Sequence, residues 1–175
     1  IKVYYYIAPK VWAWKEWRVK GIKKYVDRLY TIFPFETDYF KKWGIDAIYN
    51  GNPLLDSVDN HPSATESKEE FCKRANINPD KTKVALLAGS RRGEIKYLLP
   101  RMIEVAKRYP SYQFLLACAP SMDIEFYKGI IGNKCSNIKL LVGETYSILR
   151  HSDAAIINSG QNMAVEVNDP AHQFC

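Results

Sequence analysis

Residues 83–94, KVALLAGSRRGE, decide the class of fold. The apolar run in Lys83–Leu87 predicts a buried strand, Gly89-Ser90 ends it, and a helix is expected near residues 94–108. The alternation continues downstream, with strands expected at Gln113–Ala117, Ile138–Val142 and Asp153–Asn158, and helices at 123–131, 145–150 and from residue 159. Four strand–helix units in succession predict an α/β fold with a Rossmann-like parallel sheet.

A second set of elements precedes these units. The expected strands are Ile1–Ile7, which is predicted to be buried, Tyr30–Phe33 and Ala47–Tyr49, and the expected helices are residues 13–29 and Glu36–Trp43. Residues 52–67 are rich in prolines, acids and small polar residues, as is typical of a linker, and Lys68–Ala75 then predicts a helix capped by Ser67. The chain should therefore hold parts of two Rossmann-like layers, residues 1–56 and 68–175, joined by a linker at 57–67.

The composition is that of a folded domain with a positive net charge, and it does not identify a function. The 175 residues are 47% hydrophobic and 25% charged, which is ordinary for a folded domain, and the net charge of +6 fits anionic partners. The four cysteines are widely spaced and the histidines lack neighbours at ligand spacing, so neither a zinc site nor a disulfide framework is expected. A reducing, cytoplasmic setting follows, and no apolar run approaches the ~20 residues of a membrane span.

The turn at Gly89-Ser90-Arg91 is the most informative local feature. Backbone N–H groups and a helix N-terminus lie beyond the carboxyl end of the expected strand, and Arg91 and Arg92 add donors that suit a diphosphate. The pattern is neither GxGxxG nor a Walker loop. An ordinary turn, with Gly89 as a tight bend and solvated arginines, explains the residues equally well.

Two further stretches have both a functional and a structural interpretation. Asn158-Ser159-Gly160 ends a strand in small residues, and Glu166 follows at a distance that would let a carboxylate accept from ribose hydroxyls. A capped helix with a surface glutamate is the simpler interpretation. Residues 8–24, APKVWAWKEWRVKGIKK, combine three tryptophans with many basic residues, which fits membrane contact, single-stranded nucleic acid or packing beneath a domain.

Five stretches, taken in order, resemble one family. They are YYIAPKVWAWKEWRV (5–19), FPFE (33–36), YNGNPLLD (49–56), LLAGSRRGEI (86–95) and INSG (157–160). Together they are similar to the lipid-A-disaccharide synthases, bacterial glycosyltransferases with two Rossmann-like domains in the GT-B arrangement. The tryptophan segment then becomes a strand-to-helix junction, with its tryptophans packed against the domain and its lysines free to meet anionic lipid as a secondary role.

The resemblance implies a reaction and the residues that take part. It implies inverting transfer of 2,3-diacylglucosamine from UDP to 2,3-diacylglucosamine 1-phosphate, with no metal and no cofactor, on the cytoplasmic face of the inner membrane. The implied binding residues for the UDP-sugar are Gly89, Ser90, Arg91, Ser159, Gly160 and Glu166, and the implied cleft-lining residues are Pro9, Trp12 and Asn52. No nucleic acid is expected as a partner.

The chain also departs from the family pattern. Roughly a hundred residues of an ordinary domain would precede Ile1, and the catalytic group is expected there, so the chain alone should be inactive. After Gly160 the sequence reads QNMAVE where the family has Thr-Ala-Thr-Leu-Glu, with one extra residue before the acid. The alternatives are another GT-B enzyme, such as a UDP-N-acetylglucosamine epimerase or the peptidoglycan transferase, and a non-catalytic basic module that binds lipid or RNA.

Overall fold

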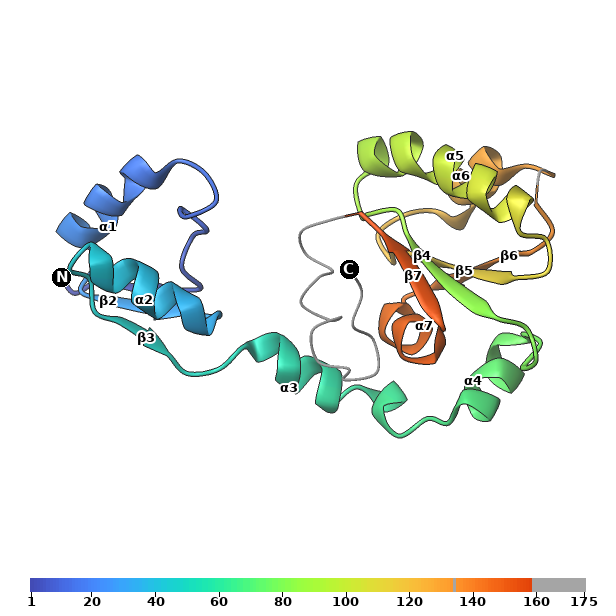
Figure 1. Cartoon of the computed structure of the whole chain (residues 1–175), viewed down its shortest axis with the longest axis horizontal. Coiled ribbons are helices and arrows are strands. Elements are labelled where there is room, and N and C mark those ends of the chain that lie inside the picture. The colour runs from blue at the N-terminus through green and yellow to red at the C-terminus, as the bar shows by residue number, and fades with distance from the viewer. Residues whose placement is uncertain (134, 159–175) are drawn as a thin grey trace. The chain divides into compact units, whose positions relative to one another are not determined.

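The computed structural model describes residues 1–133 and 135–158, and the chain divides into two compact units (Figure 1). The first unit is Ile1–Asp59 and the second begins at Asn60. No helix in the described part of the chain combines the length and apolar character needed to cross a membrane.

The second unit is built on a four-stranded parallel sheet. Its strands are β4 (Lys83–Leu87), β5 (Gln113–Cys118), β6 (Ile138–Val142) and β7 (Ala154–Ile157), in the spatial order β6-β5-β4-β7. The chain therefore builds outward from β4 to β6 and then returns to the other side of β4. This order is that of one half of a Rossmann fold, so the predicted α/β class with Rossmann-like parallel sheets is confirmed.

Helices cover both faces of this sheet (Figure 1). Helices α5 (Arg92–Arg108) and α6 (Ile124–Ile131) pack on the face that carries Val84 and Leu86. Helices α4 (Lys68–Ala75) and α7 (Thr145–His151) pack on the face that carries Ala85 and Leu87. Because successive side chains of a strand point to opposite faces, residues 84–87 of β4 must be apolar, which is what the sequence shows. Lys83, the first residue of β4, is also buried, and its ammonium donates to the carbonyls of Pro79 and Lys81 at 2.9 Å.

The first unit holds a three-stranded parallel sheet. The strands β1 (Tyr4–Tyr6), β2 (Arg28–Thr31) and β3 (Ala47–Tyr49) lie in the order β1-β2-β3. The helices of this unit are a 3-10 turn η1 (Glu16–Arg18), α1 (Val19–Tyr25), α2 (Pro34–Lys42) and α3 (Pro53–Asp59). A small core joins α1, β2 and α2 through Val19, Ile22, Leu29 and Phe40.

Three expectations for the first unit were wrong. The strand expected to be buried is exposed: β1 lies at the edge of the described sheet, and within the described residues its tyrosines are not part of the core cluster of this unit. The helix expected over residues 13–29 is interrupted at Lys15, whose φ of 57° is left-handed, and it ends at Tyr25, so Leu29 lies in β2. The helix expected at Glu36–Trp43 begins two residues earlier, because Pro34 is the first residue of α2, where its missing N–H is harmless.

The stretch expected to be a linker contains local structure. Helix α3 and the 3-10 turn η2 (Pro62–Ala64) both lie within residues 52–67. Ser63 is buried, and the His61 ring lies 4.8 Å from the ring of Tyr146, at the start of α7. The Ser67 cap predicted for α4 is confirmed: the Ser67 side chain accepts from the Glu70 backbone N–H at 3.2 Å, and Glu70 accepts from Ser67 N–H at 2.8 Å.

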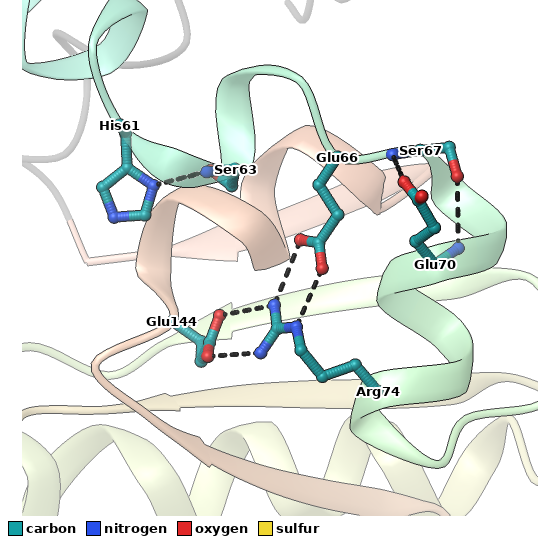
Figure 2. Close-up of polar contacts among 7 residues, drawn as sticks. All are labelled: His61, Ser63, Glu66, Ser67, Glu70, Arg74 and Glu144. Atoms are coloured by element: carbon teal, nitrogen blue, oxygen red, sulfur yellow. Dashed lines mark hydrogen bonds and ion pairs between the residues drawn. The ribbon is translucent and has the colours of Figure 1, made fainter.

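Arg74 links residues 61–67 to the rest of the second unit through hydrogen bonds to two carboxylates (Figure 2). Its guanidinium donates to Glu66 at 2.8 and 3.1 Å, and to Glu144, which precedes α7, at 2.6 and 3.0 Å. The hydrogen bonds to Glu66 and then Glu144 raise the pKa of Arg74, and its hydrogen bond lowers the pKa of Glu144. One planar guanidinium thus holds two carboxylates that are 78 residues apart in sequence (144 − 66).

Replacing Arg74 should loosen residues 61–67 more than it destabilises the unit as a whole. We expect Arg74→Met to lower the unfolding free energy by about 1 kcal/mol, because all three side chains are partly exposed. Backbone amides of residues 61–67 should exchange with deuterium several-fold faster, as measured by mass spectrometry. Lys128→Met, which breaks the exposed pair with Glu125, is the matched control and should leave those amides unchanged. Equal exchange in both variants would contradict the role given to Arg74.

Candidate functional site

The turn between β4 and α5 forms the centre of the candidate site. Gly89 follows the buried Ala88 and has a φ of +99°, a backbone conformation that other residues rarely adopt. A Cβ added there would lie 2.5 Å from Oε2 of Glu94. The positive φ therefore favours glycine at this position, whereas the Glu94 carboxylate is the end of a flexible side chain that can move aside, and the tight bend expected from the sequence is present.

Both arginines of the turn have partners. Arg91 precedes the first residue of α5, and its side chain is 83% exposed with Nη1 3.4 Å from Oε1 of Glu94. The Arg92 guanidinium lies over the ring of Phe126 in α6, 4.9 Å from the centroid. Arg91 is thus the more available donor at the turn, whereas Arg92 contributes to packing between α5 and α6.

The end of β7 lies beside this turn. Strands β4 and β7 pair up to Leu87 and Ile157, and the Asn158 N–H donates to the Leu87 carbonyl at 3.1 Å. The fold runs from β4 to β5 in one direction and returns to β7 in the other, so the strand order reverses here. Ligands of open α/β sheets bind at the carboxyl ends of strands at such a switch point. The Gly89 turn therefore lies where this fold offers a binding crevice.

Only part of the predicted UDP-sugar set can be located. Gly89, Ser90 and Arg91 form the β4–α5 turn, and Ser90 is exposed there. Ser159, Gly160 and Glu166 lie outside the described residues, as does the helix expected from residue 159. Asn158, the last residue described, is where the second predicted stretch begins.

The carboxyl edge of the three-stranded sheet carries the residues predicted to line a cleft. Pro9 is half-buried just after β1, and Asn52 follows β3. The Asn52 side-chain oxygen accepts from the Leu54 N–H at 3.0 Å, so it caps the start of α3. Trp12 is 38% exposed, and its indole donates to Glu36 at 2.9 Å.

The other two tryptophans of the segment do not pack against the domain as expected. Trp14 and Trp17 are 64% and 71% exposed, and the ammonium of Lys15 lies 4.4 Å from the ring centroid of Trp14. Val11 and Val19, which lie on either side of the left-handed residue Lys15, take core positions instead. The expectation that all three tryptophans pack inward is therefore wrong for Trp14 and Trp17.

Two glutamates at these strand ends, Glu94 and Glu36, were not predicted as site residues from the sequence. Glu94 contacts the Gly89 turn and pairs with Arg91, and the three-residue spacing of Arg91 and Glu94 on a helix was the available sign. Glu36 appeared only as the start of an expected helix and as part of the FPFE stretch, although its carboxylate accepts from an indole 24 residues earlier in the chain. No pattern along the chain predicts that long-range contact.

The parallel sheets and the switch-point turn define a Rossmann-like α/β protein of the kind that binds nucleotides at its strand ends. A sequence model described as "Lipid-A-disaccharide synthetase" matches residues 1–168, so the chain belongs to this family. The resemblance drawn from its motifs is thereby confirmed.

Curated relatives agree with this family. Lipid-A-disaccharide synthase of Syntrophus aciditrophicus is 39% identical over 165 residues, and that of Myxococcus xanthus is 37% identical over 164 residues. The enzyme of the same name from Coxiella burnetii is 36% identical over 164 residues. Each alignment covers 91% of this chain and 42% of the relative, so the chain spans about two fifths of the length of these relatives.

A side chain at Gly89 should damage the turn. We expect Gly89→Ala to lower the unfolding free energy by about 1–3 kcal/mol, because of the positive φ. The matched control is Gly129→Ala within α6, where an added Cβ meets no atom within 4 Å. That change should raise stability by about 0.5–1 kcal/mol, because alanine favours a helix interior. Urea unfolding measures both variants, and an unaffected Gly89→Ala chain would refute the geometric requirement.

Proposed function

We propose that the chain is part of a glycosyltransferase that makes the lipid A disaccharide. The reaction is transfer of 2,3-diacylglucosamine from UDP to 2,3-diacylglucosamine 1-phosphate, with inversion at the anomeric carbon and release of UDP. The observation that carries the proposal is the Gly89-Ser90-Arg91 turn at the switch point of a sheet in a member of this family. The family assignment also sets aside the epimerase and peptidoglycan transferase alternatives.

Charge on the leaving UDP is the chemical problem that the turn would solve. As the bond to the sugar breaks, negative charge develops on the diphosphate and needs cationic or dipolar partners. Backbone N–H groups at the start of α5 and the Arg91 guanidinium can supply both. In this proposal Ser159 and Gly160 approach the phosphates and Glu166 binds the ribose. We assign no metal, no cofactor and no proton-transfer residue to the chain.

Arg91 would have to exchange one anionic partner for another. Its 3.4 Å pairing with Glu94 is long and solvent-exposed, so it contributes little stability and is easily given up. A diphosphate offers more negative charge and a geometry that a guanidinium can match with two hydrogen bonds. Glu94 would then remain beside Gly89 and hold the turn in shape.

The two units would divide the substrates. The acceptor side would be formed by residues 1–56, with Pro9, Trp12 and Asn52 lining the cleft. The linker would be residues 57–67. The UDP-sugar would bind to residues 68–175. The support is that each sheet offers the carboxyl ends of parallel strands, where ligands of this fold class bind.

UDP binding tests the donor site directly. Calorimetry on the chain should show UDP binding that weakens about tenfold or more in Arg91→Ala, since a charge-assisted hydrogen bond contributes about 1.5–3 kcal/mol. Arg101→Ala is the matched control, because Arg101 lies on the same helix and stacks over Tyr97, 3.7 Å from the ring centroid. Its UDP affinity should be unchanged. Salt-sensitive binding to any polyanion, with no preference for UDP, would instead favour the non-catalytic basic module.

The acylated substrates also require access to a membrane surface, and we propose that residues 8–24 provide it on the cytoplasmic face of the inner membrane. The exposed rings of Trp14 and Trp17 combine with surrounding basic side chains, as in proteins that bind at the bilayer interface. The basic residues of this segment are Lys10, Lys15, Arg18, Lys20, Lys23 and Lys24.

Vesicle co-sedimentation tests the membrane surface. With vesicles that contain phosphatidylglycerol, the bound fraction should fall several-fold in the Trp14→Ala, Trp17→Ala double variant, because two interfacial rings are lost. Tyr97→Ala removes an equally exposed ring from the second unit and should bind as the unchanged chain does. Equal binding by all three proteins would exclude these tryptophans from membrane contact.

A further inference from the structure

Glu36 is fully buried, and the proposed mechanism assigns no role to its carboxylate. It lies at the third position of α2, and both of its oxygens accept hydrogen bonds. Oε2 accepts from the backbone N–H groups of Ile32 and Phe33 at 3.3 and 3.2 Å, and Oε1 accepts from Nε1 of Trp12 at 2.9 Å. Burying a carboxylate is costly unless such partners are present, so these three donors explain how the chain tolerates it.

Helix capping alone does not account for this arrangement. Glu70 occupies the equivalent position of α4 and accepts from the Ser67 N–H at 2.8 Å, yet Glu70 is exposed to solvent. The same capping contact is therefore available to a glutamate that stays in water. Burial of Glu36 brings one additional contact, which is the hydrogen bond from its second oxygen to Trp12.

Trp12 takes its orientation from this hydrogen bond and from Phe35. Its ring meets Phe35 edge-on, with centroids 5.0 Å apart and an interplanar angle of 79°, and Phe35 stacks on Phe33 at 5.7 Å. Because the indole N–H points inward to Glu36, the exposed part of the ring is apolar. Trp12 and Phe35, which is 50% exposed, form an aromatic corner at the carboxyl edge of the sheet, and Lys10 lies 5.2 Å from the centroid of Phe33.

We propose that Glu36 is a positioning residue, which holds the Trp12 indole so that an apolar ring surface faces the acceptor side of the cleft. The role rests on the proposed function, which places Trp12 in that cleft. Glu36 acts through Trp12 and does not itself face solvent. Its contribution is that the ring is already oriented before a ligand arrives, which lowers the entropy lost on binding.

Glu36→Gln separates capping from positioning. Glutamine serves as well as glutamate in a capping box, so a residue that only caps should tolerate the change. The amide carries one acceptor oxygen and one donor NH2 group, however. In either orientation the NH2 group faces an N–H donor: that of Trp12, or those of Ile32 and Phe33. If the amide oxygen keeps the hydrogen bonds from Ile32 and Phe33 that cap α2, the NH2 group faces the indole N–H of Trp12. The hydrogen bond that orients Trp12 is then lost.

The first experiment follows the indole N–H of Trp12 by NMR of the ¹⁵N-labelled chain, with its signal assigned by Trp12→Phe. We expect the Trp12 signal to move in Glu36→Gln and its exchange with water to accelerate by about tenfold, the factor that corresponds to about 1.4 kcal/mol. Glu16→Gln is the matched control, because Glu16 accepts from the Tyr39 hydroxyl at 3.0 Å in the same unit. An unchanged Trp12 signal in a folded Glu36→Gln chain would overturn the proposal.

A double-mutant cycle covers the case in which Glu36→Gln does not fold. In the Trp12→Phe background the indole donor is absent, so Glu36→Gln should lower the melting temperature far less than it does in the unchanged chain. Recovery of folding in the double variant supports positioning, whereas an equal loss in both backgrounds shows that Glu36 only caps α2. Neither experiment uses a substrate, so their failure is distinguishable from failure of the UDP-binding test.

Discussion

Burial of β4 on both faces is the constraint on which the second unit depends. Val84 and Leu86 belong to one hydrophobic cluster and Ala85 and Leu87 to the other, so β4, like its neighbour β5, contributes side chains to both layers of helices. A change such as Leu86→Ala would remove contacts at the centre of the sheet, where such truncations cost about 2–5 kcal/mol. The position of β4 also fixes the site, because β5 and β7 pair on either side of it and the Gly89 turn follows directly from its end.

Much of the second unit could be predicted from sequence because its signals are local. The bounds of α4 and β4 follow from the Ser67 cap and from an apolar run that ends in glycine, and both agree with the structure. The first unit was less predictable because its elements are short and its helical pattern extends past a true boundary. Val26 and Leu29 fit the spacing of α1, but the chain turns extended at Val26 and Leu29 enters β2.

The candidate site shows the same division between local and long-range information. Gly89 and Arg91 could be proposed from a strand–turn–helix pattern because their neighbours in space are also neighbours in sequence. The Trp12–Glu36 hydrogen bond and the Arg92–Phe126 stacking join residues 24 and 34 positions apart (36 − 12 and 126 − 92), and only the folded chain brings them together. The left-handed conformation of Lys15, which lies between the exposed Trp14 and Trp17, is likewise not revealed by its residue type.

The position of β1 at the edge of the described sheet has a consequence for how that sheet can be extended. Within the described residues β1 pairs only with β2, so one side of Tyr4–Tyr6 presents unpaired backbone N–H and C=O groups flanked by exposed aromatic rings. Such an edge is a template for the addition of another strand, and it lacks the lysines, prolines and bulges that commonly protect edges. A further strand, from the same protein or from a second molecule, could therefore pair with this side of β1 and extend the sheet.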